Sequence, residues 1–173
     1  AQYDVDGVST AGSGQGDFDG TGTSFPAEQM PAPGPGVLGG RAYDFPATSG
    51  DAHNFATAHG QTVPLVPRAY SALDVLLSAH HGDVSGTATV HYSDGSTAPV
   101  ALDATDWAAG SPRLGEDVAV HADSRYDHQG VPDGVGVNVW HVALPLDPAR
   151  TAVSITLPDD SRMALYALSG RNA

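Results

Sequence analysis

The chain has 173 residues, which fits one domain and is long enough to bury a core without a disulfide or a metal to hold it together. Its 20 acidic residues outnumber 7 basic ones, and the formal charge of −13 argues against nucleic acid or an anionic membrane surface as a partner, because phosphates would be repelled. The absence of cysteine excludes disulfides and thiolate metal sites.

Short apolar runs between turn signals predict an all-β protein from the first residues onward. Glycine and proline are spread along the whole chain, and long helical patterns are missing. Apart from the segments treated separately below, we expect strands over residues 3–8, 42–45, 54–57, 62–66, 118–125, 137–144, 152–157 and 163–168.

Residues 17–28, DFDGTGTSFPAE, have the spacing of a helix-flanked calcium loop. The flanking stretches, STAGSGQG and QMPAPGPG, cannot be helical, so we reject that form of the site. A loop of a sandwich could still gather Asp17, Asp19 and Glu28 around a structural Ca²⁺. The alternative is a turn-and-strand segment anchored in the core by Phe18 and Phe25.

Two further stretches need an explicit interpretation. Residues 31–40, PAPGPGVLGG, contain three Pro and four Gly, which predict an extended loop without regular structure. Residues 70–82, YSALDVLLSAHHG, fit a helical stripe through Leu73, Leu76 and Leu77, but their length and the neighbouring strands favour a buried strand.

The clearest element is a hairpin over residues 86–102, GTATVHYSDGSTAPVAL. Polar and apolar residues alternate along its first arm, and Asp94-Gly95 supplies the turn. Together these segments give nine to eleven strands in a single module over residues 1–173. We therefore predict an antiparallel β-sandwich of two packed sheets, a jelly roll.

Several motifs, taken in order, resemble a known family. GDFDGTGTSFPAEQMP is similar to the opening of β-sandwich modules attached to secreted actinobacterial glycoside hydrolases. Further similarities are the step at 43–46 (YDFP), Asp51 and Asn54 followed by Gly60-Gln61, the turn at 92–96 (YSDGS) and Asp106-Trp107. The closing segments at 147–151, 157–158 and 165–168 also match.

The resemblance implies a galactose-binding-like jelly roll with a non-catalytic, carbohydrate-associated role. It also implies a covalently linked catalytic domain, a secreted location and, in many members, a structural calcium ion. An actinobacterial source agrees with the absence of lysine beside abundant Ala, Gly, Asp, Val and Pro, which indicates GC-rich coding. No transmembrane run or signal peptide is visible, and the opening AQYDVDG is typical of a mature or excised amino terminus.

Sugar binding needs a flat apolar face with polar groups at its rim, so aromatic residues are the first candidates. Trp140 lies in GVNVWHVALPL, where alternation places Asn138, Trp140 and Val142 on one face and Val137, Val139, His141 and Ala143 on the other. Trp140 beside Asn138 could line a concave sheet, or it could belong to the core. Trp107 is a second candidate, with a plug over one end of the sandwich as its alternative.

The loop at 125–136, RYDHQGVPDGVG, concentrates polar side chains. Arg125, Tyr126, Asp127 and His128 could meet sugar hydroxyls, because planar donor and acceptor groups match vicinal diols and loops often carry binding residues. The alternative is a solvated loop.

The sequence gives no positive argument for catalysis. The eight histidines show no established zinc spacing, no serine lies in a nucleophile elbow, and no segment singles out an acid and a base. We therefore expect a non-catalytic carbohydrate-binding module that tethers a glycoside hydrolase to its glycan. The alternatives are a structural domain that packs against the catalytic domain and a small hydrolase or lyase on the same fold.

Overall fold

The computed structural model describes residues 3–173, which form twelve β-strands and one short 3₁₀ helix. In chain order the elements are β1 (Val8–Ser9), β2 (Phe25–Pro26), η1 (Ala27–Gln29), β3 (Gly34–Leu38), β4 (Arg41–Phe45), β5 (Ala56–His59), β6 (Thr62–Ala79), β7 (Val84–Tyr92), β8 (Thr97–Ala104), β9 (Asp117–Ala122), β10 (Val137–Pro145), β11 (Thr151–Thr156) and β12 (Asp159–Asn172).

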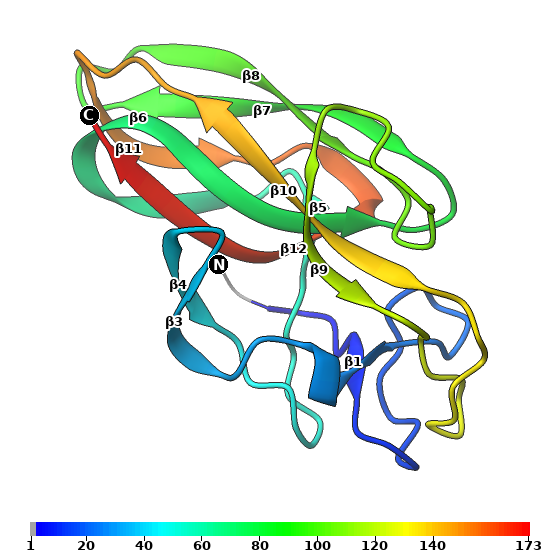
Figure 1. Cartoon of the computed structure of the whole chain (residues 1–173). Helices are drawn as coiled ribbons and strands as arrows, with labels where there is room; N and C mark the ends of the chain where they lie inside the picture. Colours follow the sequence, from blue (N-terminus) through cyan, green and yellow to red (C-terminus); the bar gives the residue numbers. More distant parts are fainter. Residues whose placement is uncertain (1–2) are drawn as a thin grey trace.

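Two antiparallel sheets share the long strand β6 (Figure 1). Residues 70–79 of β6 pair with β12 on one side and β10 on the other, which builds the central sheet β5–β12–β6–β10–β9. Residues 62–69 pair with β11, which continues into β7 and β8 as the outer sheet. The all-β antiparallel sandwich predicted from the sequence is therefore confirmed, while its finer assignment as a galactose-binding-like jelly roll stays a prediction.

The core between the two sheets is mostly aliphatic. Alternation along β6 points Leu73, Val75 and Leu77 into it, and all three are fully buried. Leu144 from β10 and Ile155 from β11 meet them from the neighbouring strands. Burial of these side chains is the main stabilising contribution of this layer.

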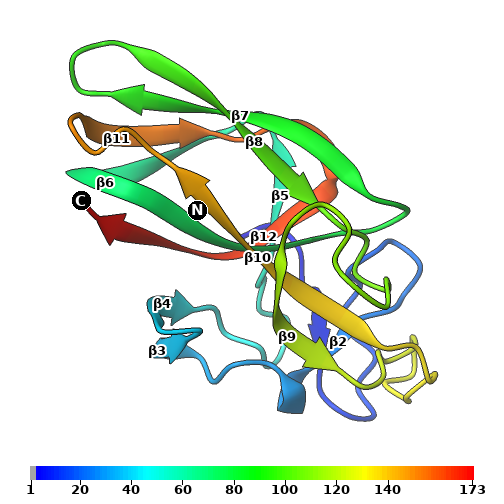
Figure 2. The same ribbon diagram turned by 45° about the horizontal axis from the view of Figure 1, so that its top comes forward.

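A third layer covers the opposite face of the central sheet. It is built from the amino-terminal part of the chain, including the β3–β4 hairpin and the short β1–β2 pair, and Figures 1 and 2 show it beneath β12, β10 and β9. A second core joins it to the sheet, in which Phe18, Phe25 and Phe55 pack with ring centroids 4.8–5.4 Å apart.

The predicted hairpin is confirmed as β7 and β8, with Thr87 opposite Ala101. Gly95 has a positive φ of 85°, which glycine adopts without a Cβ penalty, and Asp94 Oδ1 accepts a hydrogen bond from the Ser96 N–H. This turn chemistry is local, which explains why the sequence predicts the element well.

Two sequence interpretations need correction. The strands expected at 62–66 and 70–82 are parts of one continuous strand, β6. The prolines are tolerated because they fall at a bulge of β6, where residues 65–67 face only Val153 of β11. The stretch 31–40 is not an irregular loop, since residues 34–38 form β3. A two-stranded ribbon tolerates proline there because its outer edge needs no donor.

Other boundaries shift by a few residues, and the segment 3–8 contributes only an isolated bridge between Val5 and Phe55 before β1 begins. Within residues 3–173 we find no helix long and apolar enough to span a membrane.

Candidate functional site

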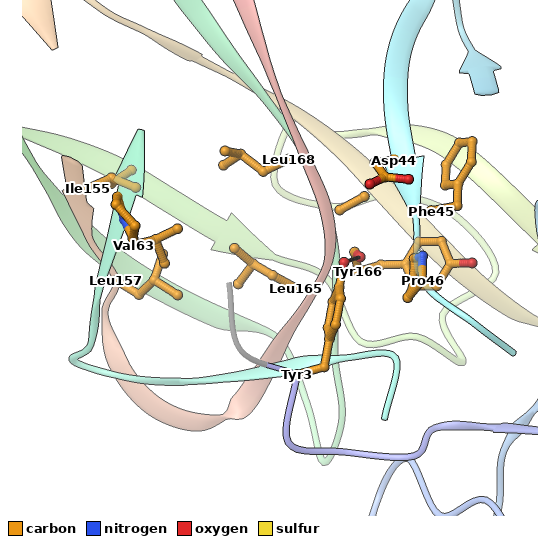
Figure 3. A pocket seen from close by; sticks show the side chains of 12 residues that line it. Tyr3, Asp44, Phe45, Pro46, Val63, Ile155, Leu157, Leu165, Tyr166 and Leu168 are labelled. Carbon is orange, nitrogen blue, oxygen red and sulfur yellow. Dashed lines mark hydrogen bonds between the residues drawn. The ribbon is translucent and has the colours of Figure 1, made fainter. Parts of the chain in front are cut away.

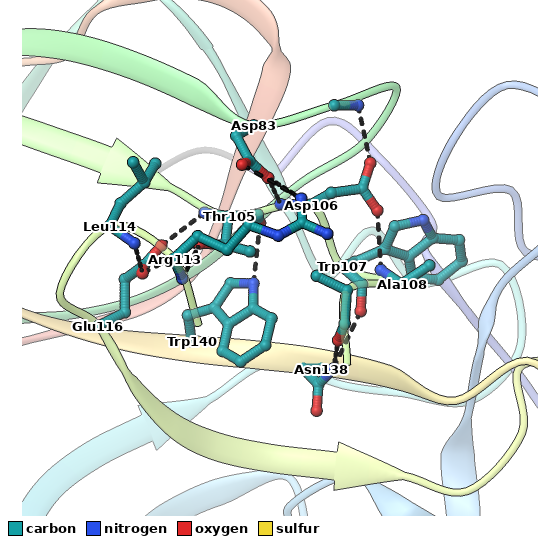
Figure 4. Close-up of polar contacts among 12 residues, drawn as sticks. Asp83, Thr105, Asp106, Trp107, Ala108, Arg113, Leu114, Glu116, Asn138 and Trp140 are labelled. Carbon is teal, nitrogen blue, oxygen red and sulfur yellow. Dashed lines mark hydrogen bonds and ion pairs between the residues drawn. The ribbon is translucent and has the colours of Figure 1, made fainter. Parts of the chain in front are cut away.

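Both tryptophans are buried, and for Trp140 the core alternative is the one observed. Trp140 is fully buried and its indole N–H donates to the Thr105 carbonyl at 2.8 Å (Figure 4). Trp107 is 2% exposed, packs on Phe18 and lies 5.7 Å from the Arg125 guanidinium. Neither ring offers a free face to a sugar, which corrects the expectation that they line a binding surface.

Asn138 is also a structural residue. Its side-chain amide donates to the carbonyls of Trp107 and Ala109, which fastens the loop after β8 to β10. Glu116 completes this fastening, because its buried carboxylate accepts hydrogen bonds from the Thr105 and Leu114 backbone and from the Thr105 hydroxyl (Figure 4). The network holds the loop against the sheet. Both carboxylate oxygens of Glu116 accept hydrogen bonds within it, and the side chain is buried.

The loop at 125–136 is held largely by its own polar groups. Arg125 Nε donates to Asp133 at 2.8 Å, and Asp127 Oδ1 accepts hydrogen bonds from the backbone of Gln129 and Val131. These two backbone bonds hold the pKa of Asp127 below its ordinary value. Tyr126 is buried and its hydroxyl donates to Glu28, whereas His128 is exposed. The loop therefore has polar groups, but most are already paired.

The three carboxylates proposed as calcium ligands do not converge. Asp17 Oδ1 accepts hydrogen bonds from the Gly20 and Gly22 backbone, Asp19 Oδ1 accepts two from Thr21, and Glu28 faces Tyr126. Burial would raise the pKa of Asp19, but the hydrogen bonds outweigh it and the pKa is lowered. The described residues hold no cluster of three or more metal-ligating side chains. The turn-and-strand alternative is the one observed, with Phe18 and Phe25 in the core.

A charged cluster that the sequence analysis did not single out lies on the central sheet, under the β3–β4 hairpin. Alternation along β6 turns Asp74 away from the aliphatic core, toward the amino-terminal layer. His141 on β10 lies opposite Leu76, and Arg171 on β12 lies opposite Ala72, so both are diagonal neighbours of Asp74. Arg41 reaches the same carboxylate from β4.

Both carboxylate oxygens of Asp74 are in contact with basic side chains. Its Oδ1 accepts hydrogen bonds from Arg171 Nη2 at 2.6 Å and His141 Nε2 at 2.8 Å. Its Oδ2 lies 3.3 Å from Arg171 Nε and 3.2 Å from Arg41 Nε. The Asp74 side chain has no exposed surface, whereas the two guanidinium side chains are 38–39% exposed. A buried carboxylate thus orients three partly exposed nitrogen-bearing groups.

These contacts determine the protonation state of Asp74. Burial would raise the pKa of its carboxyl, but the hydrogen bonds from Arg171 and His141 outweigh this effect and the pKa lies below its usual value of 3.8. Burial, followed by the charge of Asp74, raises the pKa of the neighbouring Tyr43 to about 12. At neutral pH the cluster therefore holds an ionised Asp74 and a protonated Tyr43.

The exposed side of this cluster lines a cavity of about 420 Å³, which we call the arginine pocket. Its size falls in the range of about 300–1,000 Å³ typical of small-ligand sites. Apolar side chains from the hairpin and from β9 form the rest of its wall. The lining residues are Leu38, Gly39, Arg41, Tyr43, Leu76, Asp117, Val118, Ala119, His141, Ala143 and Arg171.

A second cavity, of about 360 Å³, is lined by residues of β4, β6, β11 and β12 (Figure 3). Its wall is mostly aliphatic, with Val63, Ile155 and Leu165 on one side and Tyr3 and Asp44 on the other. The Tyr3 hydroxyl donates to the Tyr166 carbonyl at 3.0 Å. With one carboxylate and no basic group in its wall, this groove has less chemistry for a polar ligand than the arginine pocket.

The sequence did carry a signal for the missed site. Asp74 interrupts the apolar run ALDVLLSA, and a carboxylate in a buried strand must find partners. The identity of those partners could not be predicted, because Arg41, His141 and Arg171 lie 33, 67 and 97 residues away and meet only through strand order.

Comparison with protein-family models identifies the family of the chain. The model of the AziU2-like beta-sandwich domain matches residues 2–173, so the chain belongs to this family. The match agrees with the fold described above. A search of curated proteins found no match.

Proposed function

We propose that this domain is a non-catalytic carbohydrate-binding module and that the arginine pocket is its sugar site. The observation that carries the proposal is the set of three planar or cationic groups held by buried Asp74 at the wall of a ligand-sized cavity. Planar donors fixed in place suit sugar oxygens, and Leu38 and Val118 offer apolar contact to the C–H face of a ring.

Two features favour binding over catalysis. Asp74 is ionised and buried, and both of its oxygens are in contact with Arg41, Arg171 or His141, so it has no proton to donate and is not open to a substrate. Glu28 and Glu116 are bonded to Tyr126 and to the loop after β8. In the context implied by the sequence resemblance, the module belongs to a secreted glycoside hydrolase and raises the local concentration of its glycan.

A second candidate function is supported by the apolar groove of Figure 3. Its aliphatic wall would suit contact with a linked catalytic domain, in which case this domain would be a structural accessory that binds no sugar. The two functions use different surfaces and can be separated by mutation.

The test is affinity electrophoresis and glycan-array screening of the isolated domain. We expect retention by at least one polysaccharide, loss of retention in Arg171→Ala, and unchanged retention in Arg150→Ala. Arg150 is the matched control, since it also forms a bidentate contact with one aspartate, Asp94, but on the β7–β8 hairpin. No retention by any polysaccharide, with a β-rich circular dichroism spectrum, would favour the structural role.

A further inference from the structure

The arginine pocket is distinguished from the other arginine sites of the molecule by its ratio of positive to negative groups. Arg113, Arg150 and Arg162 each pair with one aspartate, and Arg125 lies near two. At Asp74, by contrast, two arginines and a histidine converge on a single carboxylate.

Hydrogen-bond donors also outnumber acceptors in the pocket. Asp74 accepts three hydrogen bonds from Arg171 and His141, and Arg41 Nε forms an ion pair with its Oδ2 at 3.2 Å. Among residues 3–173, no hydrogen-bond acceptor is found for Arg171 Nη1 or Arg41 Nη2. A ligand therefore meets N–H groups that need acceptors.

Asp117 is the one other carboxylate in the wall, and its position limits its effect. Its side chain is 88% exposed and lies 3.7 Å from His141 Nδ1, at the rim of the pocket. Water screens an exposed charge of this kind more strongly than the partly buried guanidinium groups. Arg68, which donates to Asn172 next to Arg171, adds a further positive charge at this end of the sheet.

We infer that the arginine pocket takes the carboxylate of an acidic sugar, so that the ligand is a uronate-containing glycan. The inference rests on the proposed carbohydrate-binding function and names its ligand class. A carboxylate offers two acceptor oxygens to the two free guanidinium nitrogens, whereas a neutral hydroxyl offers one and must also donate, and Asp117, which could accept from it, is exposed at the rim of the pocket. The sugar ring then lies against Leu38, Val118 and Ala119.

The negative net charge of the chain makes binding of an acidic glycan a demanding test of the inference. A chain with a formal charge of −13 repels an acidic polysaccharide, so retention cannot come from bulk attraction. At physiological ionic strength screening acts over about 8 Å, so that the charges lining the pocket outweigh those on distant faces. Binding of a polyuronate would therefore indicate a local site.

The experiment compares each acidic glycan with its own neutral form. Polygalacturonate, alginate and hyaluronan are tested beside the same polymers after carboxyl reduction, by affinity electrophoresis and calorimetry on the unmodified domain. We expect at least one acidic form to bind. Its reduced form should bind with an affinity at least about tenfold lower, because a charge-assisted contact is lost. This comparison needs no variant and so does not depend on the folding of a mutant.

Variants then locate the site. Arg41→Ala, on the hairpin, should weaken binding of the acidic glycan, while Arg150→Ala should not. Equal binding of the reduced and acidic forms, or unchanged binding by Arg41→Ala, would overturn the inference and leave carbohydrate binding standing. Displacement of the glycan by acetate or sulfate as readily as by galacturonate would mean a general anion site and would also overturn it. Absence of binding to every glycan, acidic or neutral, would instead refute the proposed function.

Discussion

The two faces of the central sheet carry different kinds of residues, although the same strands build both. The face toward the outer sheet is aliphatic, with Leu73, Val75 and Leu77 of β6 fully buried. The opposite face carries Asp74 and Leu76 from the same strand. The alternation of side chains along β6 therefore separates an apolar face from the face on which we propose ligand binding.

The second face is itself divided. At one end Phe18, Phe25 and Phe55 form a buried aromatic cluster under β12 and the loop that carries Trp107. At the other end the β3–β4 hairpin leaves the arginine pocket partly open. The amino-terminal layer thus packs on the sheet through the aromatic cluster, and the cavity beneath the hairpin is the site at which we propose ligand binding.

The largest effects should come from truncating the two cores. Leu77→Ala removes a fully buried side chain between the sheets and should lower the free energy of unfolding by about 2–5 kcal/mol. Phe55→Ala, in the aromatic cluster, should cost about 3–5 kcal/mol. Urea denaturation followed by fluorescence and circular dichroism measures both.

The comparison breaks if the amino-terminal layer is only loosely attached. In that case Phe55→Ala would unfold in two separate transitions, with the tryptophan signal lost before the β-sheet signal. Coincident transitions in both variants would support one cooperative domain.

A smaller effect, with a defined pH dependence, is expected at the charged cluster. Asp74→Asn should destabilise the protein at pH 7 by about 1.5–3 kcal/mol, since hydrogen bonds to a charged group are lost. The folded-state pKa of Asp74 lies below 3.8, so its stabilising contribution is present above that pH and is lost as the pH falls through the folded-state pKa. The difference in the free energy of unfolding between the wild type and Asp74→Asn should therefore become smaller below about pH 4.

Thermal or urea unfolding of both proteins from pH 7 down to pH 2.5 checks this prediction. Parallel curves would mean that Asp74 does not couple to Arg171 and His141 as described. Asp160→Asn, which breaks an exposed pair with Arg162, is a matched control that should change stability little at any pH.

Local features of the sequence account for what could be predicted. The β7–β8 turn follows from Asp94-Gly95, and the alternation at 137–144 correctly separates Val139 and His141 from Asn138 and Trp140. What alternation could not provide was the environment of each face. The face with His141 turns toward the amino-terminal layer and lines the pocket, whereas the face with Trp140 turns toward the outer sheet, since Trp140 lies opposite Leu77 of β6.

Long-range features could not be predicted for a physical reason. The sequence analysis placed two separate strands at 62–66 and 70–82, whereas β6 is continuous through a bulge that contains Pro67, and that bulge depends on pairing with β11, about 90 residues away. The arginine pocket depends likewise on four separate strands. A lone aspartate in an apolar strand points to such a site without naming its partners.

The smallest effect concerns a tyrosine on the aromatic side of the second face. Among residues 3–173, the Tyr166 hydroxyl is buried without a hydrogen-bond partner, and burial raises its pKa well above the ordinary value. Because an unpaired buried hydroxyl carries a desolvation cost, Tyr166→Phe should leave stability unchanged or raise it by about 1 kcal/mol. Urea midpoints at pH 7 measure this.

Tyr126→Phe is the matched comparison, since it removes the same atom from a tyrosine that does have a partner. Its hydroxyl donates to Glu28, and this bond, with burial, raises the pKa of Tyr126 to about 12. Loss of the bond should lower stability by about 1 kcal/mol. If Tyr166→Phe destabilises as much as Tyr126→Phe, the Tyr166 hydroxyl has a partner in solution, such as a buried water, and the aromatic end of this face is not dry.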